Sequence, residues 1–327
     1  MKIKTVISVG LGSIGAEISK LILKNPLLRL VGLVDKDTQK IGKDVLGCGV
    51  CVQEDLAGCL RRNKPDVVFL TTSSRFPAVV KDIRTIVAAG SDVVSSCEEL
   101  SFPWLTAYGA ADRLDAFVRK HKRRVLGTGV NPGFVMDALP LMLSNVCQRV
   151  DAIKVRRVVD VVKRRLSLQR KMSVGLSKRA FEEKLREGSA GHVVLKESLA
   201  LIGAGMGWRL RLTEKIRPIL AKKPMKTKHF SIRPGQVIGV EQIAQGKENE
   251  KLKAVLELTM RLKAKEPFDE IIIEGVPPVR MKINPGVQGD LATAACLVNA
   301  ALKLEQAPYG LLTVNDLSVA RKTRDGA

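Results

Sequence analysis

The chain has 327 residues, of which 45% are hydrophobic and 27% are charged. This length allows two domains with a core each, and the composition is typical of a water-soluble globular protein. No run of eighteen uncharged apolar residues occurs, and the N-terminus leads into a strand pattern instead of a signal peptide. We therefore expect a cytoplasmic protein without a membrane-spanning segment.

The net charge of +22 permits binding to nucleic acid, but the basic residues are dispersed and aromatic residues make up only 4%. No basic arm, zinc finger or aromatic-studded sheet accompanies them, so nucleic acid is not expected as a partner. The six cysteines are scattered, as in a reducing compartment. Cys48 and Cys51 have metal-site spacing, but no second pair or histidine couple goes with them, and no metal is expected.

The first element is a buried strand pattern over residues 3–9, followed by Gly10-Leu11-Gly12-Ser13-Ile14-Gly15 and a helical pattern. This is a G-x-G-x-x-G sequence between a strand and a helix, the position in which it indicates dinucleotide binding. Gly10 allows the tight turn, Gly12 lets the backbone approach a pyrophosphate, and Gly15 lets the helix pack closely on the strand. The helix N-terminus would hold the phosphates, which predicts a dinucleotide-binding site.

The second strand pattern, residues 28–34, ends at Asp35, twenty positions after Gly15. A carboxylate at this point can accept hydrogen bonds from both hydroxyls of an adenosine ribose and would repel a 2′-phosphate, which favours NAD. Lys36 beside it could pair with that phosphate. The sequence therefore indicates NAD or NADP, with NAD preferred.

Two more strand patterns end in polar residues. Residues 66–70 lead into Thr71-Thr72-Ser73-Ser74, whose hydroxyls either bind the nicotinamide half of the cofactor or cap the helix that begins near Pro77. Residues 91–96 lead into Cys97-Glu98-Glu99, with Ser101 expected to cap the next helix and Pro103 in its first turn. Ligands bind at the carboxyl ends of strands in open α/β sheets, so the two glutamates are placed for chemistry.

A last strand pattern over 124–127 precedes the loop Thr128-Gly129-Val130-Asn131-Pro132-Gly133-Phe134. Asn131 and Pro132 are expected at the cofactor, and Gly133 and Phe134 at the substrate. Asn131 could instead contact a substrate group, and a turn asparagine before proline fits the position as well. Alternating strands and helices up to this loop predict a Rossmann-type, doubly wound parallel sheet. Dinucleotide binding is thus assigned to residues 1–130, with residues 289–327 packing back on that domain.

The second half follows a different pattern. Strands are expected at 150–162, within 230–244 and within 255–279, and helices at 177–186 and from Gly191-His192 to 202. Successive strands without helices between them predict a second α+β domain, residues 131–288, built on a largely antiparallel sheet. We expect this domain to carry substrate binding and oligomerisation.

Several segments of the chain resemble the 2,4-diaminopentanoate dehydrogenases and the related NAD(P)-dependent amine dehydrogenases, whose N-terminal domain is similar to that of dihydrodipicolinate reductase. These segments are Gly10–Gly15, 93–104 (VVSSCEELSFPW), 126–137 (LGTGVNPGFVMD), Gly191-His192 with Glu197-Ser198, and 285–293 with 298–300. The resemblance implies hydride transfer between a nicotinamide cofactor and a carbon that bears an amine, in a cytoplasmic homodimer. The His-His run and lysine-rich loop of true dihydrodipicolinate reductases are absent from the sequence, which argues against that activity.

Oxidative deamination needs a base that takes the ammonium proton and a negative charge that holds the cationic amine. We assign both roles to Glu98, which leaves its strand first, and keep Glu99 as the second candidate. His192 is a candidate substrate residue at a predicted helix start, although a structural histidine fits that position as well.

Two other functions remain open at the level of sequence. A homoserine-dehydrogenase-like enzyme would act on a hydroxyl group and would be expected to carry lysine where Glu98 stands. A dinucleotide-sensing regulator would bind DNA through its positively charged surface, net charge +22. The absence of a helix-turn-helix pattern argues against this function.

Overall fold

A computed structural model describes residues 3–162, 164–188 and 194–317. The chain divides into two units, and it crosses between them twice, after Phe134 and after Val287. The first unit holds the described residues up to Phe134 and those from Gln288 on, and the second holds the described residues between these points. No helix of the described part is both long enough and apolar enough to cross a membrane.

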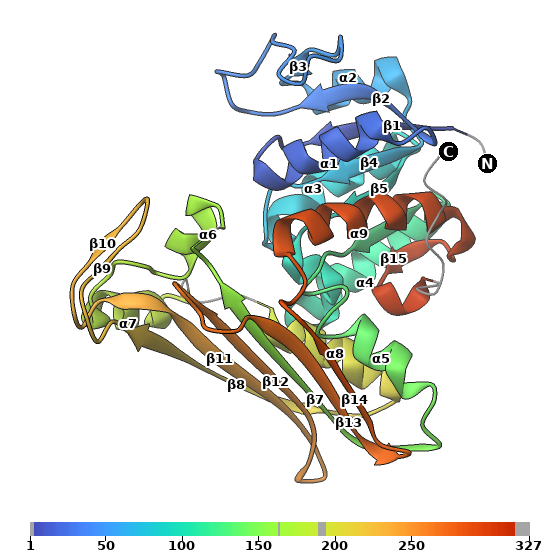
Figure 1. Cartoon of the computed structure of the whole chain (residues 1–327). Helices are drawn as coiled ribbons and strands as arrows, with labels where there is room; N and C mark the ends of the chain where they lie inside the picture. Colours follow the sequence, from blue (N-terminus) through green and yellow to red (C-terminus); the bar gives the residue numbers. More distant parts are fainter. Residues whose placement is uncertain (1–2, 163, 189–193, 318–327) are drawn as a thin grey trace. The chain divides into compact units, whose positions relative to one another are not determined.

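The first unit is built on a seven-stranded sheet in which every pairing is parallel (Figure 1). The strand order is β15-β6-β5-β4-β1-β2-β3. The strands are β1 (Lys4–Val9), β2 (Leu28–Val34), β3 (Val52–Gln53), β4 (Val67–Leu70), β5 (Asp92–Ser95), β6 (Arg124–Gly127) and β15 (Gly310–Leu312). This order contains that of the dinucleotide-binding fold, with β15 added at one edge, and confirms the predicted fold class.

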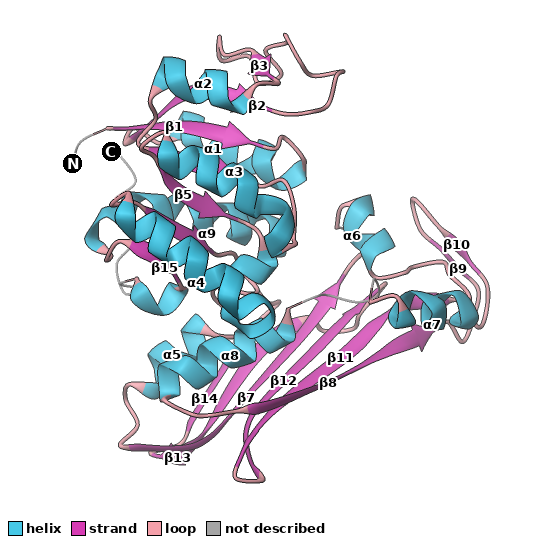
Figure 2. Ribbon diagram, turned by 180° about the vertical axis from the view of Figure 1, so that it is seen from behind, coloured by secondary structure: helices cyan, strands magenta, loops and turns pink. Residues whose placement is uncertain are grey.

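Helices cover both faces of this sheet (Figures 1 and 2). They are α1 (Ser13–Lys24), α2 (Leu56–Asn63), α3 (Phe76–Ala88), α4 (Trp104–Lys120) and α9 (Gly289–Lys303), with short 3-10 helices η1 (Glu98–Ser101), η2 (Leu304–Gln306) and η3 (Val314–Asp316). Helices α1 and α9 pack side by side, and α2, α3 and α4 share a core on the opposite face. All residues of β4 and β5 are buried, as expected for strands covered on both sides.

The C-terminal segment returns to this sheet. Strand β15 pairs with β6, and the Arg124 guanidinium donates from Nε to the Ala307 carbonyl at 2.7 Å. The same guanidinium lies 4.5 Å from the centre of the Tyr309 ring. These contacts fix residues 304–312 at the edge of the sheet.

The second unit is built on a six-stranded sheet of order β14-β13-β7-β12-β11-β8. The strands are β7 (Arg149–Asp160), β8 (Arg211–Leu220), β11 (Val237–Glu248), β12 (Lys251–Arg261), β13 (Phe268–Val276) and β14 (Val279–Ile283), beside a small pair of β9 (Met225–Lys226) and β10 (Ser231–Ile232). Only β7 and β12 pair in parallel, so the sheet is mostly antiparallel as predicted. Helices α5 (Ala138–Ser144), α6 (Leu166–Lys171), α7 (Lys178–Arg186) and α8 (Leu195–Met206) complete the unit.

Strand β8 is absent from the sequence prediction. Exposed and half-buried residues alternate along most of it, but three consecutive polar residues, 213–215, and Pro218 hide a strand pattern in the sequence. Proline is confined to sheet edges because it cannot donate a ladder hydrogen bond. In the structure β8 is an edge strand that pairs with β11. The edge position reconciles the proline with a ten-residue strand.

A buried ion pair lies in the core of the second unit. Arg157 of β7 stands opposite Asp269 of β13, with a guanidinium–carboxylate distance of 3.3 Å and side chains that are 4% and 1% exposed. Asp269 also accepts a hydrogen bond from the Val287 amide, and Arg157 donates to the Val287 carbonyl, both at 2.7 Å. The pair thus holds the chain at the point where it leaves the unit.

Candidate active site

The loops that follow β1, β2, β4, β5 and β6 all lie at the carboxyl edge of the parallel sheet in the first unit. Parallel register places the ends of neighbouring strands together, as shown by the pairing of Leu70 with Ser95 and of Ser95 with Gly127. Each predicted site residue except His192 belongs to one of these loops or to the first turn of the helix that follows it. His192 lies outside the described residues.

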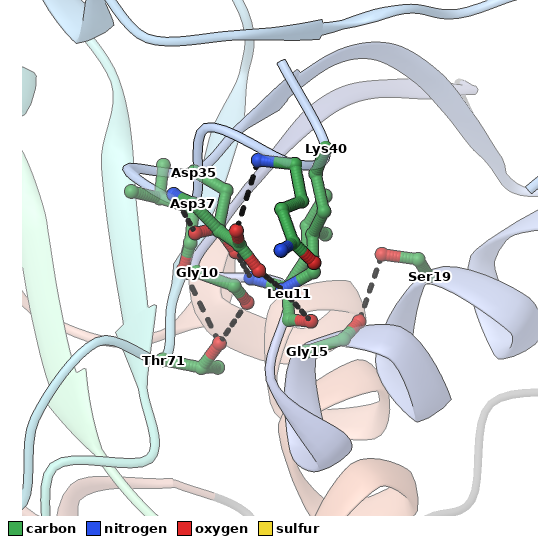
Figure 3. A network of polar contacts seen from close by, with 10 residues as sticks. Gly10, Leu11, Gly15, Ser19, Asp35, Asp37, Lys40 and Thr71 are labelled. Carbon is green, nitrogen blue, oxygen red and sulfur yellow. Dashed lines mark hydrogen bonds and ion pairs between the residues drawn. The ribbon is translucent and has the colours of Figure 1, made fainter. Parts of the chain in front are cut away.

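The glycine-rich loop has the geometry of a phosphate-binding turn (Figure 3). Gly10 adopts φ +87°, which favours glycine. A Cβ on Gly15 would lie 1.8 Å from the Gly10 carbonyl oxygen, whereas a Cβ on Gly12 would meet no atom within 4 Å. Helix α1 begins at Ser13 with no acidic side chain in its first turn. Open space beside Gly12 and a helix N-terminus fit a pyrophosphate.

Asp35 is tied to this loop. Its Oδ2 accepts a hydrogen bond from the Leu11 amide at 2.5 Å, and its Oδ1 accepts from the Asp37 amide at 2.9 Å. Burial alone would raise the pKa of Asp35, but these two amides and the Lys40 ammonium outweigh it and hold the pKa below its ordinary value. The carboxylate is therefore ionised and fixed where the adenosine ribose was predicted.

The cation beside Asp35 is Lys40, which the sequence analysis did not single out. Its Nζ lies 3.5 Å from Asp35 Oδ2 and 3.1 Å from Asp37 Oδ2, and it donates to the Leu11 carbonyl at 3.2 Å (Figure 3). The predicted cation, Lys36, has an exposed side chain. The sequence does show a second lysine five residues after Asp35, but its contact with Asp35 depends on the conformation of the 35–40 loop.

The hydroxyls after β4 hold the loops together. Thr71 donates from Oγ1 to the Gly10 carbonyl at 2.7 Å, and Ser73 Oγ accepts a hydrogen bond from the Arg75 amide at 3.1 Å. Thr72 is exposed. None of these side chains caps α3, because the first amide of that helix, on Phe76, donates instead to a carboxylate from another loop. The capping alternative predicted for these hydroxyls is therefore wrong.

That carboxylate belongs to Glu99. Its Oε2 accepts from the Phe76 amide at 2.8 Å, and its Oε1 pairs with Arg75 Nη1 at 2.7 Å. The Glu99 side chain is 9% exposed, and its amide donates to the Ser74 carbonyl. Glu99 thus joins the loop after β5 to the start of α3.

Glu98 is half-buried and begins η1. Successive side chains of a 3-10 helix are about 120° apart, so Glu98 does not share the direction of Glu99. The prediction that Ser101 caps α4 is wrong, because its Oγ donates to the Glu98 carbonyl at 2.8 Å and closes η1. The preceding Cys97 is buried, and burial raises the pKa of its thiol to about 12, which makes it a poor nucleophile.

The loop after β6 is equally constrained. Gly133 has φ +120°, and a Cβ there would lie 2.5 Å from the Gly129 amide nitrogen, so only glycine fits. The Val130 amide lies 3.4 Å from its acceptor, Thr293 Oγ1 in α9. Asn131 is half-buried and Pro132 is buried between these fixed points, while Phe134 is half-buried at the end of the unit. Sequence reasoning did not identify Thr293, whose contact with the loop depends on the return of α9.

The arrangement places a phosphate-binding turn, an ionised carboxylate and a pair of glutamates on one sheet edge. Within the described residues, no three His, Cys, Asp or Glu side chains are grouped as metal ligands. Open-edged sheets with such turns bind dinucleotides, and a carboxylate on the same edge can exchange a proton with a bound substrate.

Comparisons with known proteins agree with this chemistry. The family model for the 2,4-diaminopentanoate dehydrogenase C-terminal domain matches residues 134–326. The chain is 29% identical to 2,4-diaminopentanoate dehydrogenase of Acetoanaerobium sticklandii, over 98% of this chain and 94% of that protein. It is 27% identical to an amine dehydrogenase of Streptomyces virginiae over 46% of this chain and 44% of the relative.

A solved structure of amine dehydrogenase from Mycobacterium smegmatis has the same fold. It superposes with a TM-score of 0.87 at 23% identity and covers 98% of this chain and 97% of its own. At this identity the likeness supports the architecture of both units.

Proposed function

Because the chain belongs to the 2,4-diaminopentanoate dehydrogenase family, we propose that it catalyses the NAD(P)-dependent oxidative deamination of an amine or diamino acid. The substrate class is that of 2,4-diaminopentanoate. In the forward direction an ammonium-bearing carbon, water and the oxidised cofactor give a carbonyl group, ammonium, the reduced cofactor and a proton. The reverse direction is reductive amination.

The observation that carries this proposal is the common sheet edge on which the glycine loop, Asp35 and Glu98 follow parallel strands. Gly10, Gly12, Ser13, Ile14 and Gly15 would hold the pyrophosphate, and Asp35 would hold the adenosine ribose. The nicotinamide, when bound, supplies the two-electron acceptor for the hydride. We propose that NAD(H) binds more tightly than NADP(H), since Asp35 is ionised.

Glu98 is the proposed catalytic carboxylate. It would accept the ammonium proton, which frees the nitrogen lone pair to assist departure of the hydride. After this proton has passed to solvent, the restored negative charge of Glu98 would stabilise the iminium cation of the substrate, and the carboxylate would take a proton from the water that attacks this iminium. One carboxylate can do all three because each step needs a proton acceptor or a negative charge at the same carbon.

Glu99 is proposed as a positioning residue. Both of its oxygens already accept hydrogen bonds, from Arg75 and from the Phe76 amide. These two contacts commit the Glu99 carboxylate to the start of α3. Glu99 would instead keep η1, and with it Glu98, in place.

The loop from Asn131 to Phe134 would complete the site. The Asn131 amide group could orient the carboxamide of the cofactor or a polar group of the substrate, with Pro132 beside the cofactor and Gly133 and Phe134 beside the substrate. We further propose that the protein is a cytoplasmic homodimer and that its substrate is a small amine.

The direct test is to follow reduction of NAD⁺ and NADP⁺ with 2,4-diaminopentanoate, simple primary amines and homoserine. We expect turnover with the diamino acid or an amine, with release of ammonium equal to the reduced cofactor. Turnover with homoserine alone would replace the proposal by the hydroxyl oxidation considered from the sequence. Tight NADH binding without turnover of any of these compounds would favour a dinucleotide-sensing role.

A further inference from the structure

Lys40 lies between the acid that ends the second strand and the glycine-rich loop. Its ammonium group contacts Asp35, Asp37 and the Leu11 carbonyl at distances of 3.5, 3.1 and 3.2 Å. It therefore bridges the glycine-rich loop and the residues that follow β2 (Figure 3). The Lys40 side chain is 31% exposed, which leaves it accessible to a ligand.

Asp35, Asp37 and Lys40 together carry one net negative charge, as a lone carboxylate does, but they include a cation. An unpaired aspartate at the end of β2 excludes a 2′-phosphate by repulsion, because both groups are anionic. Here the Asp35 carboxylate has a cation 3.5 Å away, so a phosphate on the ribose 2′-oxygen would meet Lys40 as well as Asp35. Attraction to an ammonium at such distances is of the same order as repulsion by a carboxylate at similar distances.

We propose that Lys40 is a selectivity residue that lets this protein accept NADP(H) beside NAD(H) by neutralising Asp35 and pairing with the 2′-phosphate. This inference rests on the proposed function, since it concerns the cofactor of that reaction. The backbone supports it, because the Lys40 amide donates to the Asp37 carbonyl at 2.9 Å and closes a turn that returns the side chain to Asp35. Asp37 is the competitor of the phosphate, since its exposed carboxylate is the nearest ion-pair partner of Lys40.

The test measures dissociation constants for NADH and NADPH by fluorescence at fixed ionic strength. In Lys40→Gln we expect the dissociation constant for NADPH to rise about tenfold or more, because one charge-assisted hydrogen bond is lost. The dissociation constant for NADH should change less than about threefold. Lys40→Arg should retain NADPH binding because it keeps the charge. Lys43→Gln, the same charge change in the same loop, is the matched control and should leave the ratio unchanged.

A second variant is expected to gain affinity, which misfolding could not imitate. Asp37→Asn removes the competing carboxylate while Asp35 and Lys40 stay, so NADPH should bind about threefold more tightly or better, with NADH little changed. The nucleotide fragments 2′,5′-ADP and ADP should reproduce the same changes, because the effect belongs to the adenosine end and requires no amine chemistry.

The outcomes that overturn the inference are separate from those that overturn the proposed function. Equal weakening of NADH and NADPH in Lys40→Gln would make Lys40 a structural tie of the loop. A shift in the ratio in Lys36→Gln but not in Lys40→Gln would move the role to the exposed lysine. Wild-type protein that turns over amines with NAD⁺ and does not bind NADPH would reject the inference alone, whereas failure to bind either cofactor would reject both.

Discussion

Arg75 and Glu99 form an ion pair with a 2.7 Å distance between Nη1 and Oε1, although they follow two different strands of the parallel sheet. The Glu99 carboxylate is almost fully buried and also accepts the first amide of α3. It therefore replaces the local side-chain cap that this helix does not have. We therefore propose a division of roles between the two adjacent glutamates, with positioning assigned to Glu99 and catalysis to Glu98.

This division predicts different losses for the two amide variants. Glu98→Gln keeps shape but removes proton acceptance and negative charge, so kcat should fall about 10²-fold or more with NADH affinity almost unchanged. Glu99→Gln keeps one acceptor oxygen and should cost far less in kcat, with a lower melting temperature from the weakened cap. Steady-state kinetics, NADH titration and thermal unfolding of both variants make the comparison. A large loss of kcat in Glu99→Gln alone would assign the catalytic role to Glu99 instead of Glu98.

Asp35 should set the preference between the two cofactors. Asp35→Ala removes the proposed acceptor for the ribose hydroxyls, so the NADH dissociation constant should rise about tenfold and the preference over NADPH should narrow or reverse. The folded pKa of Asp35 is lowered, so its ionised form persists at every pH above its ordinary pKa of about 4 and is lost only below it. The wild-type NADH affinity should therefore stay constant between pH 7 and 9 as far as Asp35 is concerned. Tighter binding of NADPH than of NADH by the wild type would contradict this assignment.

Substitutions of Gly12 and Gly15, the second and third glycines of the motif, should have different effects. Gly15→Ala forces a Cβ to within 1.8 Å of the Gly10 carbonyl, so the backbone must shift, and both thermal stability and cofactor binding should drop. Gly12→Ala meets no atom within 4 Å, so the free energy of unfolding should change by at most about 1 kcal/mol while the cofactor loses its close approach. Denaturant unfolding and NADH titration of both variants separate the effects. Equal destabilisation by the two substitutions would contradict the packing described for Gly15.

The buried pair of the second unit should be important for stability. Asp269→Asn leaves the Arg157 guanidinium buried without its counter-charge, so we expect a loss of about 3–5 kcal/mol in the free energy of unfolding. The exposed pair of Arg149 and Asp151 is a matched control, and Asp151→Asn should leave the urea midpoint almost unchanged. Urea unfolding measures both. A small effect of Asp269→Asn would mean that water or another group compensates the guanidinium.

Cys97 lies directly before the proposed catalytic residue, but thiol chemistry is not expected there. With a pKa of about 12 and a buried side chain, its thiolate fraction at pH 8 is on the order of 10⁻⁴. The exposed Cys51 should therefore be alkylated by iodoacetamide in the native protein while Cys97 is not. Peptide mass spectrometry after timed labelling at pH 8 reports both sites. Labelling of Cys97 at the rate of Cys51 would show that the loop after β5 opens in solution.

The sequence by itself determined the elements whose signal is local. The glycine loop, Asp35 and the alternation of strands and helices identify the dinucleotide fold, because turn geometry and hydrophobic periodicity depend on residues close together in the chain. The same kind of signal placed Glu98 and Glu99 after a buried strand. It also indicated a second, mostly antiparallel sheet, since successive strands without helices need no long crossover.

Only the tertiary structure decided which polar side chains meet. Lys40 returns to Asp35 through a turn, Glu99 caps a helix that begins 23 residues earlier, and Arg157 finds Asp269 across 112 residues. None of these pairings has a local period, and each depends on strand register and loop closure. The same is true of β8, whose proline is explained by its edge position. The local pattern thus predicts the kind of site, and long-range packing determines which of its charged residues bind one another.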